Sequence, residues 1–462
     1  MSGDGGTVGL DAPPWLAVDR LLDDPQNRIV VCCGSGGVGK TTTAAALGVR
    51  AAERGRKAVV LTIDPARRLA QSMGIDSLDN TPRKVAGVGA DGGELHAMML
   101  DMKRTFDEIV EAHADGERAR AILANPFYQS LSAGFAGTQE YMAMEKLGQL
   151  RARDDWDLII VDTPPSRSAL DFLDAPKRLG SFLDGKFIRV LMAPAKVGGR
   201  AGMKFLNVGM SMMTGTLSKL MGASLLKDVQ TFVAAMDTMF GGFRTRADAT
   251  FRLLQAPGTA FLVVAAPEPD ALREAAYFVE RLAAEGMPLA GLVLNRVHGS
   301  GADQLSAERA LAAAENLEEG GIVDQESGKA GLRDAAAGSP ETGSPSAEGL
   351  TADAGGSTRD ELTPDGTGPD GTGPDGTGVD GSGVDGTGVD EVAVDALAVG
   401  LLRLHVERMQ VIAREQRTRD RFTSLHPEVA VAEVAALPGD VHDLAGLRAI
   451  GERLAAGVPA GA

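Results

Sequence analysis

The strongest candidate for chemistry is a glycine-rich loop near the N-terminus. Residues 34–41 read Gly-Ser-Gly-Gly-Val-Gly-Lys-Thr, a full match to the pattern GxxxxGK[ST]. Glycines let successive backbone N–H groups turn toward one anion, and a helix that starts after the loop adds the positive end of its dipole. An apolar run at 29–33 precedes the loop, and an alanine-rich helix is expected over 42–54. The pattern therefore predicts a nucleotide-binding loop, with ATP as ligand and Mg²⁺ as its metal.

Each residue type in this loop has an expected task. Lys40 would neutralise the β- and γ-phosphates, Thr41 would offer its hydroxyl to Mg²⁺, and Thr42 would bond a phosphate oxygen. The alternative is a glycine-rich turn without a ligand, which the flanking strand and helix disfavour. The expected nucleotide contacts in the loop are Gly34, Ser35, Gly36, Gly37, Val38, Gly39, Lys40, Thr41 and Thr42.

Two aspartates that follow apolar runs complete the candidate site. Asp162 follows the run 158–161, where an aspartate would polarise a Mg²⁺-bound water. Asp64 follows the run 59–63, and the carboxyl ends of strands face the ligand crevice of an open α/β sheet. An aspartate there could orient or deprotonate the attacking water. For both residues the alternative is a strand-end aspartate that caps the next turn.

Apolar runs alternate with helical patterns along the chain, which is typical of βαβ units and a parallel sheet. We predict an α/β fold of the P-loop NTPase type, with a mostly parallel sheet of about seven to eight strands and a helical insertion. The expected strands are Arg28–Cys33, Lys57–Ile63, Leu95–Asp101, Trp156–Val161, Ala260–Ala265, Leu289–Asn295 and Val429–Leu437. Further helices are expected at Leu170–Leu183, Met203–Met221, Leu225–Leu254 and Val394–Arg419.

These elements suggest one domain whose sheet is interrupted twice. The expected order is an N-terminal extension, the first part of the NTPase core, a helical insertion, the second part of the core, an acidic insertion, and a C-terminal helix with the last strand and tail. The corresponding boundaries are 1–27, 28–165, 166–258, 259–317, 318–393 and 394–462.

The net charge of −17 comes from one segment. Residues 301–400 contain 21 acidic and 4 basic residues, a difference that equals the net charge of the whole chain. A pentad repeat of the type Pro-Asp-Gly-Thr-Gly starts at Pro364 within this segment, which indicates a solvated, disordered insertion. Calcium binding is disfavoured because calcium-binding β-helix repeats have a nine-residue period. Without a basic excess, and with 4% aromatic residues, nucleic acid is not an expected partner.

Composition also bears on the compartment. No run of 18 or more apolar residues is present, so no transmembrane span is predicted, and the N-terminus lacks the pattern of a secretory leader. The two cysteines, Cys32 and Cys33, are adjacent and fit neither a disulfide framework nor a CxxC metal clip. We expect a cytoplasmic protein.

As a set, several short motifs resemble those of the ArsA family of ATPases, which includes arsenite-pump ATPases and the targeting factor for tail-anchored membrane proteins. The resemblance implies that Asp64 positions the hydrolytic water, that Asp162 opens the second switch, and that Asn295 and the loop near Pro438 contact adenine. It also implies a dimer that closes over two ATP molecules. The motifs are Gly36-Gly-Val-Gly-Lys-Thr-Thr42, Asp64-Pro-Ala66, Asp162-Thr-Pro-Pro165, Pro267-Glu268 and Asn295-Arg296.

Three departures from the family pattern matter. Ser35 stands where members usually have a lysine that reaches the ATP of the other subunit. Either another cation replaces it, with Arg67, Arg68 and Arg167 as candidates, or a lysine-bearing paralogue supplies it in a heterodimer; a weak or silent ATPase site is the third reading. The second switch reads Ser-Arg-Ser at 166–168, where many relatives have Thr-Gly-His. No cysteine triad for arsenite is present, so arsenite is not the expected client.

The helical insertion is rich in methionine, which suits surfaces that accept varied apolar clients. A groove for a hydrophobic client is one interpretation, and ordinary core packing of helices is the other. The methionines are Met192, Met203, Met210, Met212, Met213, Met221, Met236 and Met239.

The sequence thus supports an ATPase whose dimer closure handles a protein or membrane-associated client. The alternative is a subunit that binds ATP, hydrolyses little of it, and regulates a lysine-bearing paralogue. A spatial regulator of the cell-division and plasmid-partition class, or a P-loop kinase, is less well supported: the C-terminal segment 451–462 is short, with only two charges, and no second substrate site is evident.

Overall fold

The computed structural model describes most of the predicted core. The described residues are 14–64, 68–126, 128–129, 138–164, 242, 245–326 and 391–456. The helices expected at 170–183 and 203–221, the methionine-rich segment and the pentad repeat lie outside these ranges. The chain divides into two compact units, Met1–Ser306 with Glu407–Ala462, and Ala307–Val406, which are described separately.

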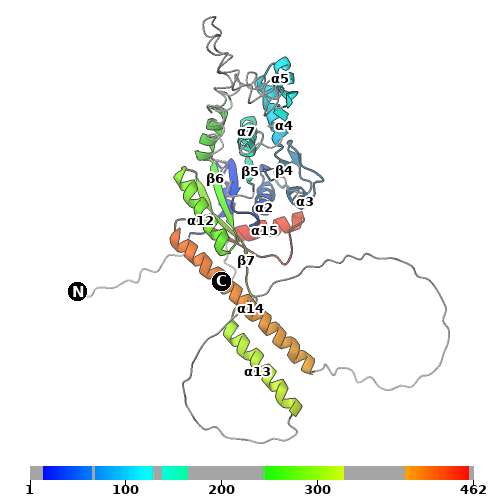
Figure 1. The fold of residues 1–462 in the computed structure, drawn as a ribbon, viewed down its shortest axis with the longest axis vertical. Coiled ribbons are helices and arrows are strands. Elements are labelled where there is room, and N and C mark those ends of the chain that lie inside the picture. The colour runs from blue at the N-terminus through cyan, green and yellow to red at the C-terminus, as the bar shows by residue number, and fades with distance from the viewer. Residues whose placement is uncertain are drawn as a thin grey trace, which may run out of the picture. The chain divides into compact units, whose positions relative to one another are not determined.

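One eight-stranded sheet organises the larger unit (Figure 1). Its order is β3-β4-β2-β5-β1-β6-β7-β8, and every neighbouring pair is parallel except the edge pair β3–β4. The strands are β1 (Ile29–Cys33), β2 (Lys57–Thr62), β3 (Arg83–Lys84), β4 (Glu94–Met99), β5 (Leu158–Asp162), β6 (Thr259–Ala265), β7 (Leu289–Val297) and β8 (Val431–Ala435). The prediction of a mostly parallel α/β sheet is confirmed. The one strand it lacked is β3, which has two exposed residues and no apolar run.

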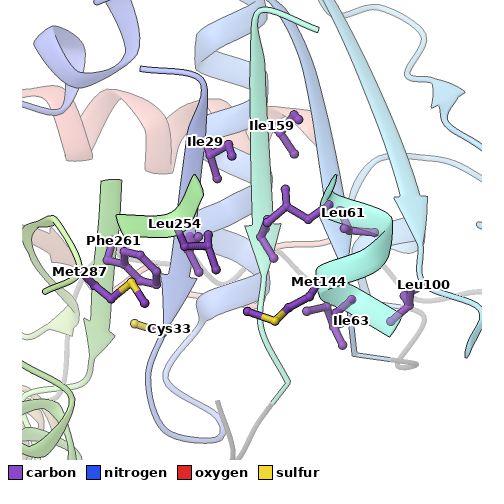
Figure 2. Packing of buried hydrophobic residues seen from close by; sticks show 14 of the residues in the cluster. Ile29, Cys33, Leu61, Ile63, Leu100, Met144, Ile159, Leu254, Phe261 and Met287 are labelled. Carbon is purple, nitrogen blue, oxygen red and sulfur yellow. The ribbon is translucent and has the colours of Figure 1, made fainter. Parts of the chain in front are cut away.

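Successive side chains of the central strands point to opposite faces of the sheet, so each strand contributes to two apolar layers. In β1, Ile29, Val31 and Cys33 belong to one buried cluster, and Val30 and Cys32 to the other. Figure 2 shows part of the first cluster, in which Leu61 of β2 lies between Ile159 of β5 and Met144 in the view. Burial on both faces explains why these strands appear in the sequence as continuous apolar runs.

Helices cover both faces of the sheet. One layer contains α1 (Val18–Asp23), α2 (Lys40–Glu53), α3 (Arg68–Ser72) and α15 (Leu444–Ala456), and α15 packs on α2. The other layer contains α4 (Met102–His113), α5 (Gly116–Leu123), α7 (Thr138–Arg153) and α12 (Pro269–Ala284). Residues 245–255 are also helical, as expected for the end of the predicted helix at 225–254.

The N-terminal segment is more than an extension. Trp15 forms a parallel bridge with Val431, and Leu16, Val18 and Leu22 are buried in the core. The side chain of Arg56, itself buried, ties this segment to the sheet. Its guanidinium donates to the carbonyl oxygens of Leu22, Asp24, Asn27 and Asp157 at 2.7, 2.9, 2.8 and 2.5 Å. Residues 14–27 therefore belong to the folded core.

Two long helices border the acidic insertion. The first, α13 (Ala307–Glu326), continues past the boundary expected at 318, and the second, α14 (Glu391–Leu425), contains the predicted helix 394–419. Within the smaller unit Arg403 of α14 pairs with Glu318 of α13 at 2.7 Å. In the described ranges, no helix is both long and apolar enough to cross a membrane.

Arg56 provides a test of the packing of the N-terminal segment. We expect Arg56→Lys to lower the free energy of unfolding by about 2–4 kcal/mol, because a lysine cannot reproduce the planar guanidinium that serves four carbonyl oxygens. Chemical denaturation measures the change, with Arg20→Lys on the exposed side of α1 as the control. Equal midpoints for the two variants would contradict this account of Arg56.

Candidate functional site

The glycine-rich loop lies between β1 and α2, at the edge of the sheet where the parallel strands end. Gly34, Gly37 and Gly39 have φ values of +149°, +78° and +96°, a region that other residues rarely adopt. Close contacts add a second constraint. A Cβ on Gly34 would lie 2.1 Å from the carbonyl oxygen of Val264, and one on Gly39 would lie 2.2 Å from Nδ2 of Asn295. The loop is therefore fixed by β6 and β7 as well as by its own turn.

Lys40 is the first residue of α2, and it is 6% exposed. Its Nζ donates to the carbonyl oxygen of Ser35 at 2.7 Å, so the ammonium group lies against the loop that it would serve. Burial lowers the pKa of Lys40, and the carboxylate of Asp162 opposes that shift. The ammonium is thus a partly desolvated cation that lies against a backbone carbonyl oxygen of the loop.

Asp162 lies at the end of β5 and is completely buried. Its Oδ2 accepts hydrogen bonds from Oγ1 of Thr41 at 2.7 Å and from Oγ1 of Thr62 at 2.8 Å. Burial raises the pKa of Asp162 to about 6, although the two threonine hydrogen bonds lower it. The carboxylate therefore contacts α2 and β2 through one oxygen.

The second oxygen of Asp162 bears on the expected magnesium ion. Oδ1 is buried and has no hydrogen-bond partner among the described residues. A buried carboxylate oxygen beside a threonine hydroxyl fits Mg²⁺, which takes hard oxygen ligands and keeps several waters. The described residues contain no cluster of three or more His, Cys, Asp or Glu side chains that could hold a metal by themselves. The protein oxygens at this position would therefore supply only some of the ligands of a metal, and a phosphate would supply others.

Thr62 connects the two candidate aspartates. Its Oγ1, which donates to Asp162, accepts a hydrogen bond from the backbone N–H of Asp64 at 3.2 Å. The chain just before Asp64 is held from α7, because Nε2 of Gln139 donates to the carbonyl oxygen of Ile63 at 2.8 Å. The sequence analysis found neither Thr62 nor Gln139; their only signal is polarity beside a strand end.

The end of β7 brings Asn295 to the loop. Asn295 is 8% exposed, and its Nδ2 donates to the carbonyl oxygen of Val38 at 2.8 Å. Pro438 follows β8, the neighbour of β7 in the sheet, and so lies at the same edge. The adenine contact expected of these two residues remains a prediction.

A pocket of about 440 Å³ adjoins the loop on the α12 side. Its walls come from the loop and from the ends of β6 and β7 together with the start of α12. The lining residues are Ser35, Gly36, Gly37, Val38, Ala266, Glu268, Asp270, Ala271, Glu274 and Arg296.

Of the other residues expected at the site, only some lie within the described ranges. Arg68, a candidate replacement for the missing lysine, is exposed at the start of α3, whereas Arg67, Arg167 and the Ser-Arg-Ser sequence at 166–168 lie outside the described residues. Thr163, which follows Asp162, donates from Oγ1 to the carbonyl oxygen of Cys32 at 2.9 Å. The chain just after Asp162 is therefore fixed to β1.

Comparison with known proteins adds a family and several relatives. The sequence profile of a family described as anion-transporting ATPase, ArsA, matches residues 27–319. The ATPase GET3 of Podospora anserina is 26% identical over 302 residues, which cover 64% of this chain and 81% of that protein. The ATPase GET3 of Malassezia globosa is 30% identical over 173 residues, 37% of this chain and 49% of that protein. ATPase BagA of Mycobacterium tuberculosis is 27% identical over 168 residues, 34% of this chain and 48% of that protein.

The raised pKa of Asp162 leads to a test of stability against pH. Above pH 6 the ionised, buried carboxylate destabilises the ligand-free fold; this penalty disappears as the pH falls through 6 toward the ordinary aspartate pKa of about 4. Asp162→Asn should therefore raise the free energy of unfolding at pH 8, on the order of 1–3 kcal/mol, and the gain should shrink toward pH 4. Denaturant titrations at several pH values check this, with exposed Asp155→Asn as the control. A pH-independent difference would argue against a buried carboxylate.

Proposed function

Because the chain belongs to the ArsA family of anion-transporting ATPases, we propose that it binds Mg²⁺-ATP at the loop 34–42 and hydrolyses it. The comparisons confirm the predicted family and the prediction of an ATPase. The observation that carries the proposal for this chain is the buried Asp162 carboxylate, which holds the hydroxyl of Thr41 and keeps one oxygen unpaired beside it.

The residues would divide the work as follows. The N–H groups of the loop and the ammonium of Lys40 bind the β- and γ-phosphates, and the hydroxyl of Thr41 with the carboxylate of Asp162 holds the metal and its water. A bound Mg²⁺ would supply positive charge to the phosphate oxygens. Asp64 orients the attacking water or takes its proton. Because Thr62 bonds to both aspartates, it would keep the two carboxylates in register.

The adenine end of the nucleotide would lie along the carboxyl ends of β7 and β8. Asn295 and the loop at Pro438 are the proposed contacts there. Asn295 already uses its amide N–H₂ group on the carbonyl oxygen of Val38, so its position depends on that of the loop. A bound nucleotide and the loop would then both restrict the position of Asn295 at the end of β7.

Coupling to a client is the second part of the proposal. We assign residues 166–258 to a helical subdomain between two parts of the NTPase core, and we propose that closure of a cytoplasmic dimer over ATP alters a client surface there. The position of Thr163 supports this link, because the chain that leads into the subdomain starts beside Asp162 and is bonded to β1. A hydrophobic protein segment is the proposed client.

Ser35 favours a second candidate function. Its side chain carries no charge, and its carbonyl oxygen is occupied by Lys40. A chain of this kind could bind ATP, hydrolyse little of it, and complete the site of a lysine-bearing paralogue in a heterodimer.

Steady-state ATP hydrolysis by the purified chain tests the first candidate. We expect Lys40→Ala to lose nucleotide binding, and Asp64→Asn to lower kcat by about 10²–10⁴-fold while ATP still binds, because that carboxylate acts on the water and not on the nucleotide. Asp155→Asn, an exposed aspartate before β5, is the matched control for Asp64.

The outcomes separate the two candidates. Hydrolysis well above the Lys40→Ala level would establish a complete site in this chain. Tight Mg²⁺-ATP binding without hydrolysis would exclude the first candidate and favour the regulatory subunit. Absence of nucleotide binding would exclude both.

A further inference from the structure

Arg296 has an unusual backbone conformation at the end of β7. Its φ is +62°, in the left-handed region that bulky residues avoid. The register between β7 and β8 pairs Asn295 with Val434 and Val297 with Ala435, so Arg296 is the extra residue of a bulge. The other described non-glycine residues with positive φ are Asp91 and Asp154, a type that tolerates this conformation. Bulges beside active sites re-aim side chains, and strain of this kind gathers at functional sites.

The residue at the bulge adjoins the pocket beside the loop. Arg296 lines this pocket together with Ser35, Gly36, Gly37 and Val38. The neighbouring Asn295 side chain bonds to Val38, so the backbone that carries the guanidinium is tied to the same loop. Arg296 is exposed, and its side chain has no hydrogen bond or ion pair with another described residue.

The described charges around the loop leave part of the negative charge of a bound triphosphate without a counter-charge. Lys40 is the one described cation that bonds to the loop, and the carboxylates of Asp162 and Asp64 are close enough to act on its charge. A nucleoside triphosphate carries more negative charge than one ammonium neutralises, even with a divalent metal. An arginine can meet a phosphate with two parallel hydrogen bonds, which a lysine cannot do.

The pocket also contains carboxylates, which limit where a phosphate can lie. Glu268, Asp270 and Glu274 come from the start of α12, and Arg296 is the basic residue among the described lining. A phosphate within the α12 side of the pocket would be repelled. A guanidinium placed between the carboxylates and a phosphate over the loop would satisfy both.

We propose that Arg296 is a phosphate-contacting residue of the nucleotide site, which supplies at the terminal phosphate the positive charge that Ser35 lacks. This inference rests on the proposed binding of ATP by the loop. The phosphate belongs to the nucleotide of the same chain or to that of a facing copy, and the experiment below distinguishes these sources.

The test compares Arg296→Asn with Arg296→Lys. Asparagine tolerates the left-handed conformation, so the first variant removes the charge without adding backbone strain, and the second keeps the charge. Arg153→Asn is the control, an exposed arginine at the end of α7, before the amino end of β5 and therefore at the opposite edge of the sheet. Equilibrium binding of ATP and ADP and steady-state hydrolysis are measured for each chain.

We expect Arg296→Asn to lower the ratio of ATP to ADP affinity about 10-fold or more, because a charge-assisted bond to the terminal phosphate is lost. Arg296→Lys should keep part of that ratio, and Arg153→Asn should keep all of it. Adding Ser35→Lys to Arg296→Asn should restore the ratio, since a lysine at 35 would return the missing charge. An unchanged ratio in Arg296→Asn, or an equal loss for ATP and ADP, would overturn the inference.

A mixture of two variants identifies the source of the phosphate. If Arg296 acts on the facing copy, a mixture of Arg296→Asn with Lys40→Ala hydrolyses ATP faster than the two separate chains together, because the Lys40→Ala chain lends its Arg296 to the intact loop of the other. The rate stays at the sum of the two separate chains if Arg296 acts within its own chain. If the unmodified chain binds ATP no better than Lys40→Ala does, the proposed function fails and this inference fails with it, whereas a failure confined to Arg296→Asn leaves the proposed function intact.

Discussion

The buried carboxylate of Asp162 is the constraint on which the rest of the site depends. One oxygen of this group accepts hydrogen bonds from Thr41 on α2 and Thr62 on β2, so a single atom sets the positions of three neighbouring elements at the centre of the sheet. A fully buried carboxylate weakens a fold, as its pKa of about 6 indicates. The two apolar layers on either side of the sheet supply the stability that tolerates it. The buried carboxylate therefore lowers the stability of the fold locally, and the packing of the two apolar layers compensates for it.

The loop has a second set of restraints on its other side. Gly34 lies against β6 and Gly39 against β7, at distances that leave no room for a side chain. The end of β7 continues to His298, whose backbone N–H and Nδ1 lie 2.9 and 2.6 Å from the two carboxylate oxygens of Glu415 on α14. A short path of contacts thus runs from the glycine-rich loop through Asn295 to a helix about 120 residues later in the sequence. Movement of the loop would therefore bear on α14 through these contacts.

Elements with a strong local pattern could be predicted from the sequence. The central strands are continuous apolar runs because both of their faces are buried, and Lys40, Thr41 and Asp162 belong to motifs that specify their surroundings. Thr62 and Arg56 could not be found in this way, because their importance comes from partners that are distant in the sequence. Arg296 could be noted as part of a motif, but its bulge exists only once β7 pairs with β8. The helix α13 passes its expected end because alanine and glutamate favour a helix as readily as they fit an acidic linker.

The two cysteines give the chain a practical property. Cys32 and Cys33 are buried side by side in β1, and burial raises both thiol pKa values, that of Cys33 to about 12. Thiols react as thiolates, so neither residue would compete for a maleimide or a spin label near neutral pH. No other cysteine is present in the sequence. The unmodified chain is therefore a ready background for single introduced cysteines, and dyes placed on α14 and α12 could report nucleotide-dependent movement without any native residue being replaced.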